Sequence, residues 1–196
     1  MGCGAQAESH LYALDVVLPL RRVWVSDLDE EKANAFALRM TDALGVPVEV
    51  APDLEAAVAR SWVTVTCTTS HKPILGPGIA PPGAFIAAVG ADNPGKHEID
   101  PELMRAAKVV VDSLAQCTAI GDLHHALAAG VMTADDVHGE LAQVVAGSCE
   151  GRRDDNEVII FDSTGTALQD VAAAALIYRR ALEGGRGSRV ELASRG

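Results

Sequence analysis

The sequence lacks the features that mark several large classes of protein. Its 196 residues include 16 lysine and arginine residues against 27 aspartate and glutamate residues, for a net charge of −11, and they contain no basic run. A chain with this excess of negative charge repels phosphate groups, which argues against broad binding to nucleic acid or to an anionic membrane surface. We therefore expect a small molecule as its partner.

Cysteine pairs and long apolar runs are also missing. The four cysteines are widely spaced and form no CxxC pair, so the sequence indicates neither a zinc knuckle nor a disulfide framework. No uninterrupted run of about 18 apolar residues suggests a membrane span, and no charged-then-apolar leader precedes the first motif. We expect reduced thiols, no bound metal and a soluble, cytoplasmic protein.

Of all residues in the chain, 48% are hydrophobic, and over its first part apolar and β-branched runs alternate with helical patterns. This alternation is typical of a doubly wound parallel α/β sheet. A segment rich in proline and glycine, 72–83, is predicted to be a loop. The predicted strands are 22–26, 46–50, 62–66, 84–89 and 108–111, and the predicted helices are 7–18, 33–44 and 54–59, with a further helix capped by Asp100.

The pattern changes after residue 113. We predict helices at 122–129 and 135–146, a strand at 158–161, and a final helix at 167–182 that begins with a Thr166/Gln169 capping box. Val171, Ala175, Tyr178 and Leu182 would form the buried stripe of that helix. The predicted organisation is a dinucleotide-binding domain over 1–113, an extension completing it over 114–184, and a flexible tail over 185–196.

The chain opens on the GxGxxA turn Gly2-Cys3-Gly4-Ala5-Gln6-Ala7. In a Rossmann unit the first glycine makes the tight turn out of the first strand, the second lets the backbone approach a pyrophosphate, and the third small residue lets helix and strand pack closely. The helical pattern that follows would place a helix N-terminus against the phosphates. Only Met1 precedes this turn, where a buried strand is expected.

Asp27 lies at the end of the second predicted strand, at the position where an acidic side chain binds the adenosine ribose hydroxyls. Such a carboxylate repels a 2′-phosphate, which favours NAD over NADP. The alternative is that Asp27 caps the next helix, although Asp29 is better placed as the cap.

A second polar turn follows the strand predicted at 84–89. Asp92 on this turn is a candidate general acid or base, and Lys96 could orient a carboxylate or the cofactor amide. The spacing alone is equally consistent with an Asx turn beside a solvated lysine.

Four segments together resemble the ornithine cyclodeaminase/μ-crystallin family, in the order in which that family carries them: GCGAQA at 2–7, VGADNPGKHEID at 89–100, VVVDS at 109–113 and FDSTGTALQDVA at 161–172. The resemblance implies a Rossmann domain that binds a nicotinamide dinucleotide, and activity on an amino acid or a cyclic imine. The cyclodeaminase branch converts ornithine to proline through an imine, whereas other branches are alanine dehydrogenases, ketimine reductases or μ-crystallin-like binding proteins without catalysis.

The same resemblance implies a role for each matching position. Asp92 would be the catalytic acid/base and Asp27 the ribose ligand. The pyrophosphate would lie near Gly2, Gly4, Ala5 and Gln6, Thr68 or Thr69 would line the cofactor, and Val89, Gly90, Lys96 and Ser163 would border the nicotinamide.

The chain also departs from the family. Relatives carry an N-terminal segment that supplies the first Rossmann strand, the dimer interface, and the lysine and arginine that hold the substrate carboxylate. We expect this chain to be a portion of such a protein, which as a whole would be a homodimer. Without the central strand its neighbours would keep unpaired edges, so we expect weak stability or aggregation of the isolated chain.

Other polar residues are interpreted as structural. His124 and His125 are adjacent on a predicted helix and diverge by about 100°, which does not suit a shared metal. Cys67 is interpreted as a small core residue rather than a nucleophile.

Three hypotheses for the function of the chain follow. The first is the enzyme, the second is the non-catalytic binding module, and the third and weakest is a degenerate fragment without function.

Overall fold

A five-stranded parallel sheet, with strand order β3-β5-β9-β7-β8, forms the centre of the computed structural model, which describes residues 1–190. The five strands are β3 (Val63–Thr66), β5 (Phe85–Ala88), β9 (Ile159–Asp162), β7 (Lys108–Val111) and β8 (Gly139–Glu140). Four of them end in register, because Thr66 pairs with Ala88, and both Ala88 and Val111 pair with Asp162. Their carboxyl ends therefore form one edge, which is where ligands bind in open α/β sheets.

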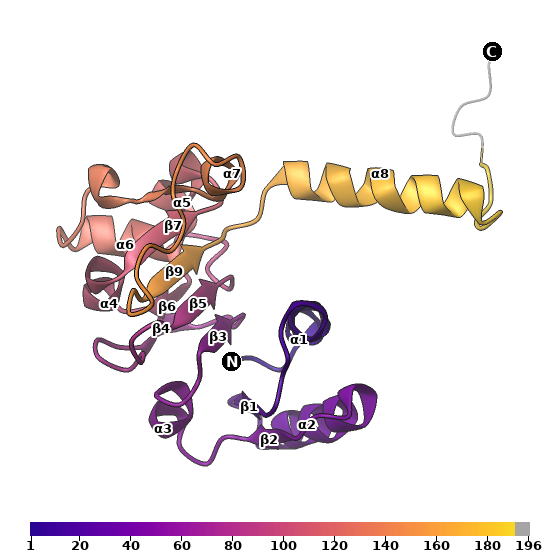
Figure 1. Ribbon diagram of the computed structural model, residues 1–196, viewed down its shortest axis with the longest axis horizontal. Coiled ribbons are helices and arrows are strands. Elements are labelled where there is room, and N and C mark those ends of the chain that lie inside the picture. Colours follow the sequence, from indigo (N-terminus) through magenta and orange to yellow (C-terminus); the bar gives the residue numbers. More distant parts are fainter. Residues whose placement is uncertain (191–196) are drawn as a thin grey trace. The chain divides into compact units, whose positions relative to one another are not determined.

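A separate two-stranded parallel sheet pairs β1 (Val23–Val25) with β2 (Val48–Val50). Within residues 1–190 no strand pairs with both β1 and β3, and Figure 1 shows the N-terminus between these two strands. The backbone at Met1 connects them: its amino group donates to the Val65 carbonyl at 2.7 Å and its carbonyl accepts from the Cys67 N–H at 3.0 Å. The strands β1 and β2 thus form a sheet of their own beside β3, and in the larger sheet β9 lies between β5 and β7.

A cavity of about 120 Å³ lies where the first Rossmann strand would run. Its walls are side chains of α1 (Ala5–Val17), β1, α3 (Leu54–Val58) and β3, including Leu11, Val25, Val58 and Val65. The cavity also reaches the start of the glycine turn, since Gly2, Ser26 and Cys67 are among the residues that line it.

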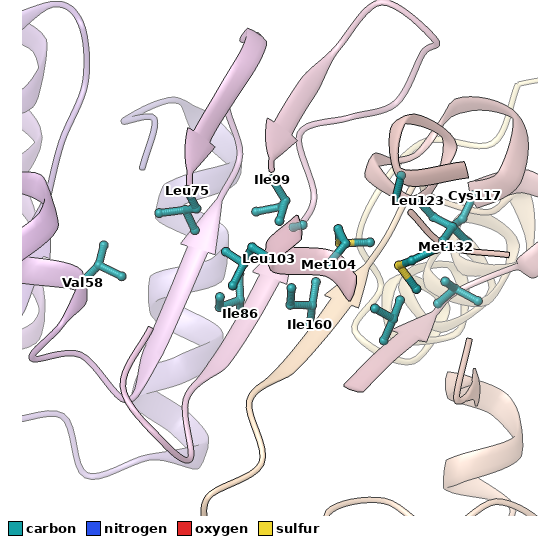
Figure 2. Packing of buried hydrophobic residues seen from close by; sticks show 14 residues of the cluster. Val58, Leu75, Ile86, Ile99, Leu103, Met104, Cys117, Leu123, Met132 and Ile160 are labelled. Atoms are coloured by element: carbon teal, nitrogen blue, oxygen red, sulfur yellow. The ribbon is translucent and has the colours of Figure 1, made fainter. Parts of the chain in front are cut away.

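Two clusters of buried apolar side chains correspond to the two sheets. The larger covers the five-stranded sheet, and Figure 2 shows Ile86, Leu103, Met104 and Ile160 gathered at its centre. It is completed by α4 (Pro101–Ala106), α5 (Leu114–Ile120) and α6 (Asp122–Ala128). The smaller cluster, with Phe36 and Met40 at its centre, packs α2 (Glu30–Leu44) and α1 against β1 and β2.

Local sequence signals account for several helix ends. Asp29 caps α2, its carboxylate accepting from the Lys32 N–H at 3.0 Å, and α2 ends at Gly45 in the left-handed conformation. Asp100 caps α4 by accepting from the Glu102 N–H, with Pro101 in the first turn. These two caps are confirmed as predicted.

Two predictions of secondary structure within residues 1–164 were wrong, and one helix was missed. The segment predicted as a loop begins with β4 (His71–Leu75), which pairs with β6 (His97–Ile99) because Leu75 and Ile99 are both buried in the larger core; the proline of β4 is tolerated in this outer pair. The predicted helix 135–146 is instead a 3₁₀ turn (Ala134–Asp136), β8 and α7 (Leu141–Val145), because Gly139 pairs with the edge of β7. Helix α5 was not predicted.

The chain divides into two units, Met1–Thr164 and Gly165–Gly196. The second unit holds α8 (Ala167–Glu183), which begins with the predicted Thr166/Gln169 capping box. The prediction that one stripe of this helix is buried was wrong, because Val171, Tyr178 and Leu182 are exposed. The domain boundary at residue 113 stays a prediction, as does the tail, of which residues 191–196 lie outside the described part.

Candidate functional site

The glycine turn begins at the carboxyl edge of the sheet with Gly2, whose φ of +80° is a left-handed conformation. Its N–H donates to the Ser26 carbonyl at 2.8 Å, and a Cβ at this position would lie 2.8 Å from the Cys67 carbonyl oxygen. Only glycine meets both conditions without strain, so the turn is held tightly between β1 and the segment after β3.

Gly4 opens α1 and leaves its N-terminus bare. In the described part of the chain no side chain caps this helix, and a Cβ built on Gly4 would meet nothing within 4 Å. The first N–H groups of a helix have no partner within it, and the macrodipole adds partial positive charge there. Gly4, Ala5 and Gln6 therefore present uncapped helix N–H donors of the kind that bind a pyrophosphate.

Asp27 lies directly beside this turn at the end of β1. Its Oδ2 accepts from the Cys3 N–H at 2.8 Å and from the Lys32 Nζ at 2.9 Å, and its Oδ1 accepts from the Asp29 N–H at 3.1 Å. Partial burial raises the pKa of Asp27, but these hydrogen bonds outweigh it and the net pKa is lowered. The carboxylate is ionised and ties the glycine turn to the start of α2.

Lys32 is a residue of this site that the sequence reasoning missed. It lies in the first turn of α2 and points back to Asp27, with its side chain 48% exposed. The sequence contained a signal for Lys32: it lies three residues after the Asp29 cap, in the first helical turn, which starts close to the end of the preceding strand.

The turns after β3, β5 and β9 contain most of the other predicted residues. The Val89 N–H donates to the Thr66 carbonyl at 2.9 Å, and the Ser163 N–H donates to the Ala88 carbonyl at 2.9 Å, so these turns continue the register of the sheet. The Ser163 hydroxyl donates to Asp112 at 2.9 Å. Thr68 is half-buried with its hydroxyl bonded to Glu98, whereas Thr69 is exposed.

Asp92 and Lys96 form an ion pair of 2.8 Å on the loop after β5. The hydrogen bond from Lys96 lowers the pKa of Asp92, so this carboxylate is ionised at neutral pH. Its side chain is 54% exposed, whereas that of Lys96 is 17% exposed. Asp92 is therefore available to a ligand while its lysine partner is held in place.

Two imidazoles hold the backbone of this loop. His71 Nδ1 lies 2.5 Å from the Gly95 carbonyl oxygen and His125 Nε2 lies 2.7 Å from the Lys96 carbonyl oxygen. His125 also stacks on His97, with ring centroids 3.9 Å apart. Burial, followed by the nearby His125, lowers the pKa of His97. These histidines support the loop structurally, and no group of three or more His, Cys, Asp or Glu side chains within residues 1–190 could hold a metal ion.

Three acidic side chains, Glu98, Asp122 and Asp162, are fully buried behind the loops. Asp122 Oδ1 accepts from the N–H groups of Glu98 and Ile99, and Asp162 accepts from those of Asp122 and Leu123. Burial raises the pKa of Asp122 to about 7 and that of Asp162 to about 8. The sequence reasoning assigned Glu98 no role, since burial of a charged residue in a polar turn has no local sequence signal.

The site thus has two sides within Met1–Thr164: the glycine turn with Asp27, and the turns after β3, β5 and β9 with Asp92. Gly2 packs against the segment Cys67–Thr68, and Thr68 is joined through Glu98 to the turn that leads to Asp92. Cys67 lies between them with its Sγ near the Met1 carbonyl, and burial raises its pKa, which fits a thiol that does not act as a nucleophile.

A family model described as the ornithine cyclodeaminase/mu-crystallin family matches residues 1–185. The chain belongs to this family. An alanine dehydrogenase of Archaeoglobus fulgidus is 41% identical over 191 residues, covering 97% of this chain and 58% of the relative. The resemblance to this family that the sequence indicated is confirmed.

Two solved structures of this family share the fold. An archaeal alanine dehydrogenase dimer with bound NAD has a TM-score of 0.91 and 40% identity, covering 98% of this chain and 59% of its own. The Thermococcus litoralis Δ1-pyrroline-2-carboxylate reductase, in complex with NADH and L-proline, has a TM-score of 0.92 and 32% identity, with 96% and 59% covered. The chain therefore spans somewhat over half the length of these relatives, and the Rossmann-type fold is confirmed.

Proposed function

We propose that this chain is the NAD-binding portion of an enzyme that interconverts an amino acid and its imine. The observation that carries the proposal is that the carboxyl ends of the parallel strands carry the ionised Asp27 after β1 and the ionised Asp92 after β5, with the bare N-terminus of α1 beside Asp27. A dinucleotide needs the helix N-terminus and Asp27, and proton transfer beside its nicotinamide needs Asp92.

Simple oxidation or reduction at the α-carbon is the reaction that the relatives favour. They are named as an alanine dehydrogenase and a pyrroline-2-carboxylate reductase, which correspond to the alternatives that the sequence resemblance offered rather than to its lead reaction. Cyclising deamination of ornithine is therefore the second candidate. The substrate class is a small amino acid or imine, and the whole protein would be a dimer, as the archaeal alanine dehydrogenase is.

The residues present fit the cofactor. Gly4, Ala5 and Gln6 would receive the pyrophosphate at the N-terminus of α1, and Asp27 would accept hydrogen bonds from the ribose hydroxyls. Thr68, Val89, Gly90 and Ser163 would surround the nicotinamide at the ends of β3, β5 and β9. When bound, NAD supplies the hydride acceptor for the α-hydrogen of the amino acid.

Asp92 would move the accompanying proton. In the oxidative direction its carboxylate accepts one proton from the substrate ammonium, so that the nitrogen lone pair forms the C=N bond as the hydride leaves the α-carbon. The products are the iminium, the reduced cofactor and protonated Asp92, which then releases its proton to water. Lys96 keeps Asp92 ionised before the step, as the proton acceptor must be.

The test is NADH binding to the chain, followed by turnover of L-alanine and L-proline with NAD by the native protein that contains it. Asp92→Asn keeps the size of the side chain and removes the proton acceptor, so turnover should fall by about 10²–10⁴-fold while NADH affinity stays within about threefold. Turnover that survives Asp92→Asn would remove the assigned acid/base. NADH binding without turnover of any amino acid by the native protein would instead indicate a non-catalytic binding protein.

A further inference from the structure

Glu98 receives four hydrogen bonds although it lies fully buried in β6. Its Oε1 accepts from the N–H and the hydroxyl of Thr68, each at 2.7 Å. Its Oε2 accepts from the Thr66 hydroxyl at 2.7 Å and from the Gly90 N–H at 2.8 Å. Each oxygen therefore holds one hydroxyl and one backbone N–H, and none of the ion pairs of the described residues involves this carboxylate.

The two backbone donors belong to the turns on either side of the predicted nicotinamide position. Thr68 follows β3 and packs beside Gly2, whereas Gly90 follows β5 and its carbonyl accepts from the Asp92 N–H at 3.1 Å. These turns leave adjacent parallel strands, and no hydrogen bond of β3–β5 pairing extends beyond the one from Val89 to Thr66. Beyond that point, one carboxylate connects the two turns.

Two contacts restrict the movement of the Glu98 carboxylate: the bond between its backbone and Asp122, and the close approach of Gly90. The Glu98 N–H donates to Asp122 Oδ1 at 2.8 Å, which anchors its backbone to the start of α6. Gly90 lies so close that a Cβ there would come within 2.5 Å of the Glu98 carboxyl atoms. Glu98 is therefore a rigid spacer whose length sets the distance between the two turns.

We propose that Glu98 is a positioning residue for the nicotinamide half of the cofactor: it sets the spacing of the Thr68 and Gly90 turns, so that the nicotinamide lies beside Asp92. This role rests on the proposed NAD site. Glu98 should not affect binding of the adenosine half of the cofactor, which would contact the glycine turn and Asp27.

Glu98→Gln is the sharpest variant, because it keeps the size and removes one acceptor. The amide has one acceptor oxygen, so in either orientation its NH₂ faces a backbone N–H, that of Thr68 or that of Gly90. The hydroxyls can rotate to compensate, but a backbone N–H cannot. One of the two turns must therefore lose its connection. Glu102→Gln is the matched control, an exposed glutamate on α4 whose side chain pairs with Arg105.

The experiment measures the dissociation constants of NADH and of ADP-ribose, which lacks the nicotinamide, for the chain and both variants. We expect Glu98→Gln to weaken NADH by about tenfold and ADP-ribose by less than about twofold, while Glu102→Gln changes neither. General destabilisation would weaken both ligands together, so the ratio separates positioning from a purely structural role. Circular dichroism of each variant reports its folding.

The outcomes are distinguishable. If the unsubstituted chain binds neither ligand, the proposed function fails; if it binds both equally, it does not hold the nicotinamide and the role of Glu98 is wrong. If Glu98→Gln fails to fold, Thr66→Val is measured instead, since it removes one donor of the carboxylate and keeps the side-chain shape. An NADH-selective loss of about threefold would then support the proposal, and an equal change or none for both ligands would overturn it.

Discussion

The two sides of the proposed site are built in different ways. The adenosine side, comprising Gly2–Gln6, Asp27 and Lys32, consists of backbone donors and one partly exposed carboxylate on the small β1–β2 sheet. The nicotinamide side, comprising Thr68, Val89–Lys96 and Ser163, is supported by the buried acids Glu98, Asp122 and Asp162 behind the five-stranded sheet. Both sides depend on tertiary contacts, but the first is held by backbone hydrogen bonds around one partly exposed carboxylate and the second by carboxylates buried behind the sheet.

The largest expected effect tests whether the two sheets are stabilised separately. Ile160 and Met40 are both fully buried, one in each hydrophobic cluster. Replacing either by alanine should cost about 2–5 kcal/mol, through lost transfer free energy and the cavity left behind. Amide hydrogen exchange should accelerate mainly in β5 and β9 for Ile160→Ala, and mainly in α2 and β1 for Met40→Ala. Equal acceleration in both regions for both variants would show that the sheets are one cooperative unit.

A second prediction uses the opposite pH behaviour of the two sides. The folded pKa of Asp122 is raised to about 7, so its contribution to stability is full below the unfolded pKa of about 4 and is lost as the pH rises toward 7. The folded pKa of Asp27 is lowered, so its contribution is present above its unfolded pKa and is lost as the pH falls.

Asp122→Asn keeps the oxygen that accepts from Glu98 and Ile99 and removes the titrating group. The decrease in unfolding free energy between about pH 5 and about pH 8 should shrink by about 2 kcal/mol relative to the unsubstituted chain, as measured by urea denaturation. Asp15→Asn, at an exposed position, is the control and should leave this slope unchanged. An unchanged slope in Asp122→Asn would mean that Asp122 is ionised throughout.

A third prediction changes the choice of cofactor on the adenosine side. Asp27→Ser removes the carboxylate that would bind the ribose and frees Lys32, which lies 2.9 Å from it. NADH affinity should fall by about tenfold, or about 1.4 kcal/mol, and NADPH affinity should rise because the lysine can meet a 2′-phosphate. Titration with both cofactors checks this. If NADPH binding does not improve, Lys32 does not lie next to the 2′-position.

The smallest effect compares two helix caps, one on each side. Asp29→Ala and Asp100→Ala should each lower the unfolding free energy by about 1 kcal/mol, since each removes one acceptor for a first-turn N–H. Asp29→Ala keeps the backbone N–H that bonds to Asp27, but it loosens the start of α2, which carries Lys32, and should therefore also weaken NADH. Asp100→Ala should leave ADP-ribose affinity unchanged, and a loss there would contradict the separation of the two sides.

The candidate residues of the adenosine side were easier to recognise in the sequence than Glu98, for a physical reason. Gly2, Gly4 and Asp27 stand at a turn, a helix start and a strand end, which are patterns visible in the sequence, although Asp27 contacts Cys3 24 residues away. Glu98 acts on residues 8 to 32 positions away, and its burial follows only from the packing of β6 against α6. For the same reason β4 was mistaken for a loop, because Leu75 makes it a strand by entering the core.

The measurement that tests the account most directly is a map of backbone amide shifts on adding ADP-ribose and then NADH. The account predicts that both ligands shift Gly2–Gln6 and Asp27, and that only NADH also shifts Thr68–Ser70 and Val89–Lys96. NADH that shifts the glycine turn without reaching Gly90 or Asp92 would contradict the placement of the nicotinamide at this edge.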